Sequence, residues 1–205
     1  MKKAILILIL INAFSTFSQK TTYGLVLGIN ATDTENGPYS GHQRLIFSND
    51  APGLDGFNLG IYLDLPLNKK FGLKSYLTYN NENETYYSNT FQEYDFEINI
   101  NSVQFSSALK YHFKEDYNQG FYLLTGPRIT HTLNTKNKRV PALNDIHKKY
   151  NFGLQFGFGF TLYEFIKTEF IADYGLSNII ELDNIEVKAY NLKLNLNFNI
   201  EHIIK

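Results

Sequence analysis

Apolar and polar residues alternate along several stretches of this sequence, most clearly in the last one. From position 190 to 200, every second residue is tyrosine, leucine, phenylalanine or isoleucine, and the residues between them are asparagine or lysine. Residues 151–162 repeat the pattern, with glycine, asparagine, glutamine and threonine between the apolar residues. Because successive side chains of a β-strand point to opposite faces, this period of two predicts strands with one apolar and one polar or small face.

Six further stretches follow the same rule less strictly. They are residues 22–31, 56–65, 70–80, 98–113, 120–133 and 165–176. In the fourth of these the phase slips between Ile100 and Val103, which predicts a β-bulge. Lengths of about 9–11 residues are what a tilted β-strand needs to cross a membrane. The pattern therefore predicts eight membrane-spanning strands.

The connections between these stretches are alternately long and short. The short ones are residues 66–69, 114–119 and 163–164, and the long ones are 32–55, 81–97, 134–149 and 177–186. In bacterial outer-membrane barrels, short turns face the periplasm and long loops face the exterior. The sequence thus predicts an all-β fold, an eight-stranded antiparallel up-and-down transmembrane β-barrel. We expect it in the outer membrane of a Gram-negative bacterium, with both termini in the periplasm.

The N-terminal residues have the three parts of a secretory signal peptide. Lys2 and Lys3 precede an apolar run at 4–11, and small residues Thr16 and Ser18 follow it. The run is too short for a membrane-spanning helix, which needs about 20 apolar residues. We expect cleavage after Ser18, so that residues 1–18 are removed and residues 19–205 form a single barrel domain.

Several stretches resemble a known family of barrels. They are YGLVLGIN (23–30), GFNLGIYLDLPLNKKFGLKSYLTY (56–79), SVQFSSALKYHF (102–113), GFYLLTGPRIT (120–130), NFGLQFGFGF (151–160) and DYGLSNI (173–179). The sequence resembles the outer membrane protein β-barrel domain common in Bacteroidota, often described as porin-like or PorT-like. The resemblance implies an integral outer-membrane protein. Some relatives serve secretion and gliding machinery, so docking to such envelope machinery is one expectation for this chain.

Composition narrows the function further. The formal net charge of −1 offers no basic face for nucleic acid. The absence of cysteine excludes disulfides, thiolate catalysis, thiolate metal sites and lipoprotein acylation. The five histidines contain no zinc-protease spacing. We therefore predict a protein that is not an enzyme and that has no cofactor and no metal site.

Charged residues fall on the polar face of the predicted strands. They are Asp64, Lys74, Lys110, His112, Arg128, Lys167, Glu169, Asp173 and Lys193. An eight-stranded barrel is just wide enough for side chains to fill it, and buried charges must be paired to be tolerated. We expect a salt-bridged plug that keeps the barrel shut. A small channel or transporter remains the alternative, and it would need a continuous wet path past these charges.

Two predicted outer loops differ in character. One is basic and contains Lys136, Lys138, Arg139, Lys148 and Lys149. The other is aromatic and acidic and contains Glu82, Glu84, Tyr86, Tyr87, Phe91, Glu93 and Tyr94. The two loops would attract each other. Alternatively, the basic loop would bind lipopolysaccharide phosphates, and the aromatic loop would bind a protein or glycan, because exposed aromatic residues favour interfaces.

Alternation alone does not say which face points inward. An inverted barrel, with the apolar face inside, would be a secreted lipocalin-like protein that binds an apolar ligand. The glycines and asparagines of the polar face argue against this, because a soluble exterior is normally rich in lysine and glutamate. The preferred interpretation is a monomeric outer-membrane barrel with a filled lumen, whose role lies in its outer loops or in docking to envelope machinery.

Overall fold

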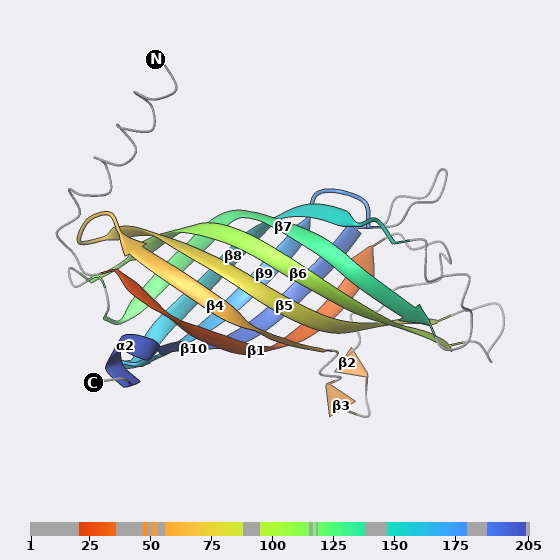
Figure 1. The fold of residues 1–205 in the computed structure, drawn as a ribbon, viewed down its shortest axis with the longest axis horizontal. Helices are drawn as coiled ribbons and strands as arrows, with labels where there is room; N and C mark the ends of the chain where they lie inside the picture. The colour runs from red at the N-terminus through yellow and green to blue at the C-terminus, as the bar shows by residue number, and fades with distance from the viewer. Residues whose placement is uncertain are drawn as a thin grey trace, which may run out of the picture.

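The computed structural model describes residues 21–35, 47–48, 51–52, 56–87, 95–114, 117, 119–137, 147–179 and 188–203. Eight antiparallel strands form a closed barrel (Figure 1). They are β1 (Thr22–Glu35), β4 (Gly56–Pro66), β5 (Phe71–Tyr87), β6 (Asp95–His112), β7 (Phe121–Asn137), β8 (Tyr150–Tyr163), β9 (Ile166–Gly175) and β10 (Lys188–Asn199). The barrel closes because β1 pairs with both β4 and β10. The predicted fold class is confirmed.

Three short elements lie outside the barrel wall. Strands β2 (Phe47–Ser48) and β3 (Ala51–Pro52) form a separate two-stranded sheet, and helix α2 (Ile200–Ile203) follows β10. No helix in the described ranges has the length and apolar character to cross a membrane. The first barrel strand begins and the last one ends at the same end of the barrel, which we call the terminal end (Figure 1). The opposite end is called the loop end.

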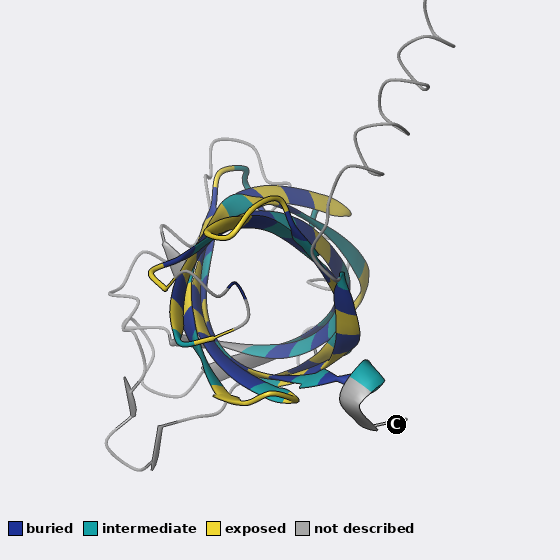
Figure 2. Cartoon of the chain, turned by 90° about the vertical axis from the view of Figure 1, so that its left-hand side faces the viewer, coloured by how far each residue is buried: buried dark blue, intermediate teal, exposed yellow. Residues whose placement is uncertain are grey.

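The two faces of the barrel wall have opposite chemistry. Buried and exposed residues alternate along the strands (Figure 2). Outward positions carry large apolar side chains such as Leu27, which is 51% exposed, and Ile61, which is 54% exposed. Inward positions carry buried polar residues such as Asp64 and Asn80. The apolar face therefore points outward, and the inverted barrel with an apolar ligand inside is excluded.

Several strands extend further at the loop end than predicted. Strand β5 continues to Tyr87 and β6 begins at Asp95, and the two remain paired along this extension. The predicted loops therefore began too early: Glu82, Glu84, Tyr86 and Tyr87 belong to β5, and Lys136 belongs to β7. Alternation of apolar residues does not reveal these extensions because polar side chains occupy much of them. Phe91, Glu93, Tyr94, Lys138 and Arg139 lie outside the described residues.

The predicted bulge lies on β7 rather than on β6. Asn101 of β6 pairs with Asn134, whereas the next residue of β6 pairs with Thr132, so Leu133 is an extra residue on β7. Strand β6 keeps its alternation, with every even-numbered residue from 98 to 112 buried. The apparent slip in the sequence arose because the apolar residues of β6 near the loop end, Ile98 and Ile100, face inward.

Candidate functional site

The nine titratable residues predicted for the polar face all lie on the inner side of the wall. Each is at most 5% exposed. They come from six strands, β4 to β7 and β9 and β10. Because side chains from many strands converge in a narrow lumen, residues far apart in the sequence become neighbours. Their contacts form two clusters, one nearer the terminal end and one nearer the loop end.

The cluster near the terminal end has two halves, and the first half surrounds Asp64 of β4. Lys110 Nζ donates a hydrogen bond of 2.6 Å to Asp64 Oδ2, and Lys167 Nζ lies 3.5 Å from the same oxygen. The hydroxyl of Tyr117 donates to Asp64 Oδ1 at 2.5 Å. Both oxygens of this fully buried carboxylate are thus engaged, by two cations and a phenol.

Glu169 of β9 forms the second half of the same cluster. Lys74 Nζ lies 2.5 Å from Glu169 Oε1. Tyr122 donates to that oxygen at 2.7 Å, and Tyr76 donates to Oε2 at 2.8 Å. The ammonium of Lys74 also lies 4.4 Å from the ring centre of Tyr62. Contacts with the face of an aromatic ring stabilise a desolvated cation, so the interior tyrosines complement both signs of charge.

The cluster near the loop end surrounds Asp173. Arg128 Nε donates to Asp173 Oδ1, and Lys193 Nζ lies 3.7 Å from Oδ2. Gln155 Nε2 donates to Oδ2 at 3.4 Å. Lys193 also donates to Gln104 Oε1 at 2.9 Å. The guanidinium group thereby fixes the carboxylate while amides satisfy the remaining polar groups, as buried charges require.

Amide side chains in the lumen form hydrogen bonds with one another and with the carboxylate of Glu82. Asn58 Nδ2 donates to Asn30 Oδ1 at 2.7 Å and to Asn195 Oδ1 at 3.0 Å. Asn30 and Asn191 donate to Glu82 Oε1, at 3.5 and 3.3 Å. Glu82 was predicted in an outer loop, but it is buried in the lumen. Its even position on β5, in step with the inward residues at 74, 76, 78 and 80, was the signal that identified it.

The turn between β6 and β7 contributes Tyr117, which the sequence pattern did not identify. The ring of Tyr117 lies 4.6 Å from the ring of His112 and 4.5 Å from Lys110 Nζ. A Cβ atom at Gly72 would lie 1.7 Å from the Tyr117 hydroxyl, so a larger residue there would have to displace the tyrosine ring. Burial, with Asp64 beside it, raises the pKa of the Tyr117 phenol well above its usual value.

Taken together, these contacts make the interior a network of fixed and mutually satisfied charges. Five cationic side chains share the carboxylates of Asp64, Glu169 and Asp173. Among the residues that the structure describes, no three histidine, aspartate, glutamate or cysteine side chains converge on a point where they would hold a metal ion. The arrangement suits a rigid filling of the lumen, because each of these carboxylates is held by a cation and by uncharged donors.

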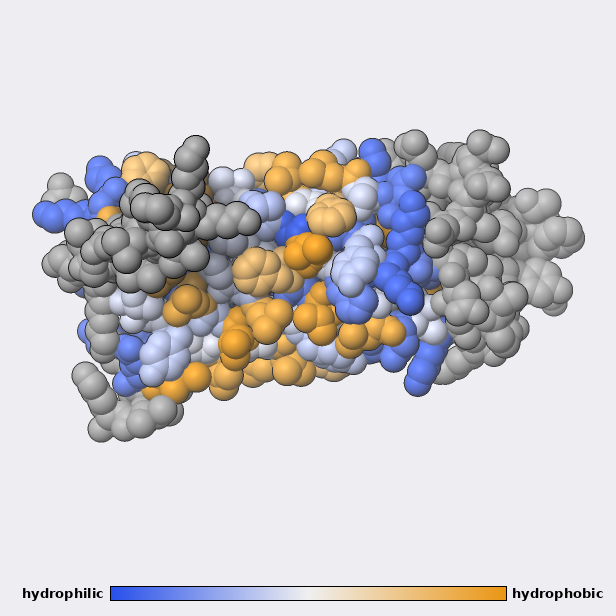
Figure 3. All heavy atoms as spheres, turned by 45° about the horizontal axis from the view of Figure 1, so that its top comes forward, coloured by the Kyte–Doolittle hydropathy of each residue, from blue (hydrophilic) through white to orange (hydrophobic). Residues whose placement is uncertain are grey.

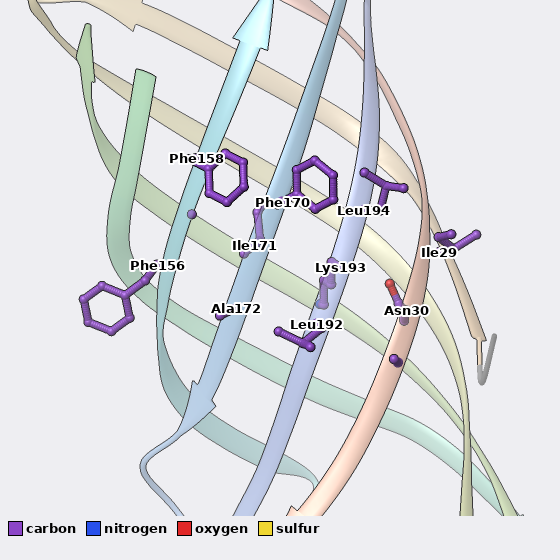
Figure 4. Close-up of a pocket in the computed structure, with 12 residues that line it drawn as sticks. Ile29, Asn30, Phe156, Phe158, Phe170, Ile171, Ala172, Leu192, Lys193 and Leu194 are labelled. Carbon is purple, nitrogen blue, oxygen red and sulfur yellow. The ribbon is translucent and has the colours of Figure 1, made fainter. Parts of the chain in front are cut away.

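A separate groove of about 610 Å³ lies on the outer surface, across β8, β9, β10 and β1. Figure 4 shows Ala172 between Phe156 and Leu192. The small side chain of Ala172 leaves a hollow between these larger ones. The side chains around the hollow are exposed and apolar. The groove therefore belongs to the apolar outer face and not to the charged interior.

The structure describes three lysines of the predicted basic loop. Lys136 and Lys149 are exposed, and Lys148 is half-buried. The backbone N–H of Lys148 donates to the carbonyl of Ile179 at 2.8 Å, which ties the segment before β8 to the one after β9. Glu82 of the predicted acidic loop and Lys148 of the predicted basic loop line one recess at the loop end.

Comparisons with known proteins agree with this architecture. The barrel resembles neisserial surface protein A, with a TM-score of 0.55 and 9% identity over 88% of this chain and 99% of that one. It also resembles the outer membrane protein OprG from Pseudomonas aeruginosa, with a TM-score of 0.51 and 14% identity over 87% of this chain and 92% of that one. At such identities the likeness shows the fold alone. None of the curated proteins matches the sequence.

The sequence itself matches a family model over residues 17–181. That model describes the outer membrane protein β-barrel domain. The match covers all but the last of the eight barrel strands. The chain therefore belongs to the outer membrane protein β-barrel domain family and is a protein of the Gram-negative outer membrane.

Proposed function

We propose that this protein is a monomeric, non-conducting barrel that displays its loop end outside the cell and has no enzymatic activity. Both termini would lie in the periplasm. The role of the protein would then be carried by the loop-end surface, which meets outer-membrane lipid, lipopolysaccharide or an envelope protein. The filled lumen carries the proposal, because it leaves the two ends of the barrel as the surfaces at which binding would take place.

The charge network supports a closed lumen. An ion crossing the barrel would have to displace Lys110 from Asp64 and Lys74 from Glu169. Leaving either member of a buried pair without its partner costs about 3–5 kcal/mol. The turn that inserts Tyr117 adds a further contact at the terminal end. These costs favour a plug over a channel.

The lengths of the connections support the orientation. At the terminal end, β4 and β5 are joined by four residues, 67–70, in which Asn68 Oδ1 accepts hydrogen bonds from the backbone N–H groups of Lys70 and Phe71. At the loop end the connections are longer, and β5, β6 and β7 extend beyond their neighbours. Short turns on the periplasmic side and long loops outside are typical of bacterial barrels.

A second candidate role is docking to envelope machinery at the terminal end. A recess of about 690 Å³ lies there, lined by residues that include Lys114, Glu164 and Glu201. Charges of both signs beside a recess suit recognition of a polar protein surface, since complementary charges set specificity and approach rate. In the proposed orientation this recess would face the periplasm.

Two measurements test the proposed function. The sequence has no cysteine, so Lys69→Cys at the terminal end and Lys149→Cys at the loop end provide unique labels. A membrane-impermeant maleimide applied to intact cells should label Lys149→Cys, and it should reach Lys69→Cys only after permeabilisation. The opposite result would overturn the orientation.

Conductance tests the plug. The purified protein in planar lipid bilayers should give no defined current steps. Regular steps from the wild-type protein would favour the small-channel alternative and overturn the plug. Unfolded protein serves as the control for leakage that does not come from the barrel. It is recognised because its gel mobility no longer shifts on heating.

A further inference from the structure

Five asparagines form a continuous band on the outward face of the extended strands at the loop end. We call Asn81, Asn83, Asn99, Asn101 and Asn134 the asparagine ladder. Asn81 pairs with Asn101, which pairs with Asn134, and this makes one row across β5, β6 and β7. In the next row Asn83 pairs with Asn99, and Asn99 pairs with Lys136.

Hydrogen bonds join the amides of the ladder. Asn81 Nδ2 donates to Asn101 Oδ1 at 2.7 Å, and Asn101 Nδ2 donates to Asn134 Oδ1 at 2.8 Å. Asn99 Nδ2 donates to Asn83 Oδ1 at 2.8 Å. In these bonds Asn83 and Asn134, at the two edges, act as acceptors. Each amide has two N–H donors and an oxygen with two lone pairs, so the edges of the ladder retain capacity for further partners.

The ladder begins where the apolar belt ends. Along the outward face, the row before Asn81 and Asn101 is formed by Tyr79 and Val103. The Tyr79 hydroxyl donates to Asn101 Oδ1 at 2.5 Å, and its ring lies 6.4 Å from that of Phe57. Aromatic residues occupy the membrane interface in such barrels. Two residues of strand advance about 7 Å, so the ladder lies at the level of the lipid headgroups.

The surface view shows the same order of layers. Apolar residues gather around the middle of the barrel, and a band of hydrophilic residues follows toward the loop end (Figure 3). In a membrane the apolar belt is in contact with lipid chains. The outward face is continuous from this belt into the ladder, so the first molecules that the ladder meets are the headgroups attached to those lipid chains.

The residue type is informative as well. Asparagine is depleted in strands, and a merely solvated strand extension needs no row of amides. The four amides on β5 and β6 are half-exposed, and Asn134 is exposed. Paired donors and acceptors on a flat surface match the hydroxyl groups of sugars. The exposed Lys136 beside Asn99 adds a cation suited to a phosphate group.

We propose that the asparagine ladder and Lys136 bind the saccharide headgroup of lipopolysaccharide in the outer leaflet. The amides bind sugar hydroxyls, and Lys136 binds a phosphate of the same headgroup. This inference rests on the proposed orientation, since only an external loop end meets that leaflet. Contacts between the asparagine ladder and lipopolysaccharide would hold this lipid against β5, β6 and β7. They would also fix the depth of the barrel in the membrane.

Titration of the folded protein in detergent with purified rough lipopolysaccharide, followed by native mass spectrometry, tests the site. Asn83→Thr/Asn134→Thr removes the two edge amides, which retain capacity for a ligand, and keeps good strand formers. Two lost hydrogen bonds should weaken binding at least about tenfold. Lys136→Thr is a second variant outside the amide bonds. It should weaken binding and reduce the dependence of affinity on salt.

Matched controls lie at the terminal end. Lys69→Thr and Gln119→Ser change exposed residues there and should leave binding unchanged. Phosphatidylglycerol, which is anionic but has no sugar, should bind to the wild type more weakly than lipopolysaccharide does. Equal binding of the two lipids would overturn the proposal. Unchanged affinity for lipopolysaccharide in both the asparagine variant and Lys136→Thr would overturn it too. A ladder that instead binds a protein, with lipopolysaccharide affinity unaffected by the variants, would overturn it as well.

Failure of this inference is distinguishable from failure of the proposed function. Binding in detergent does not depend on orientation, whereas maleimide labelling of Lys149→Cys in intact cells reports the orientation. Labelling from outside together with unaffected binding would reject the ladder alone. A heat-modifiable gel shift for every variant shows that each one has folded. A loss of binding then results from the substituted surface residues and not from misfolding of the barrel.

Discussion

The phenol of Tyr117 donates a 2.5 Å hydrogen bond to Asp64, although the two residues are 53 positions apart in the sequence. Tyr117 lies in the turn after β6, and Asp64 lies inside β4. The same carboxylate binds Lys110 and Lys167. A connection that would otherwise only join two strands thereby becomes part of the lumen filling at the terminal end.

Tyr117→Phe should destabilise the barrel without unfolding it. The change removes one hydrogen bond to a charged acceptor, which is worth about 1.5–3 kcal/mol. Equilibrium unfolding by urea in detergent measures the loss. Tyr163→Phe is the control, because Tyr163 is 64% exposed and should change stability little. Equal effects of the two substitutions would show that the contact with Asp64 contributes nothing.

The contact between Tyr117 and Asp64 should also make stability depend on alkaline pH. Burial raises the pKa of Tyr117 above the value of about 10 that it has in the unfolded chain. Above pH 10 the unfolded state therefore binds fewer protons than the folded state, and stability falls as pH rises. The stability difference between wild type and Tyr117→Phe should be constant from pH 7 to about 9 and should shrink above about pH 10. A difference that grows with pH would contradict the assignment.

Gly72→Ala should displace the same side chain by steric conflict. The new methyl group would lie 1.7 Å from the Tyr117 hydroxyl. The ring can move, but only if its bond to Asp64 breaks. We expect a loss of stability close to that of Tyr117→Phe and little further loss when the two changes are combined, because residues that share one contact are not additive. Fully additive losses in urea unfolding would refute this coupling.

The alternation of apolar residues predicted the barrel because every strand of a membrane barrel presents apolar side chains to lipid. The same alternation placed Asp64, Lys74 and Glu169 inside, since parity along a strand fixes the face. It could not say which cation meets which carboxylate, because that depends on strand tilt and on side chains from distant strands. Tyr117 was out of reach for another reason: it lies in a turn, where no period applies.

The strand extensions escaped prediction for a related reason. Beyond the apolar belt no lipid chain selects apolar residues, so Asn81 and Asn83 continue β5 without an apolar signal. Glu82 then looked like a loop acid, although its parity places it in the lumen beside Asn30 and Asn191. Backbone pairing continues wherever two strands remain in register, whether or not the outward side chains are apolar.

The pair formed by Lys74 and Glu169 offers the sharpest test of the charge network. Glu169→Gln leaves the fully buried ammonium of Lys74 without its carboxylate, and such a loss costs about 3–5 kcal/mol. Lys74→Met alone should cost a comparable amount, because the carboxylate then remains buried and loses its nearest cation, while it keeps the phenols of Tyr76 and Tyr122.

The double variant Lys74→Met/Glu169→Gln removes both charges. It should be more stable than either single variant, since replacing a whole buried pair is often close to neutral. Urea unfolding of the four proteins gives the coupling energy directly. Glu164→Gln, at an exposed carboxylate in the β8–β9 turn, is the control and should have a small effect. If the double variant loses the sum of the two single losses, the two charges do not stabilise each other and the plug is not held by this pair.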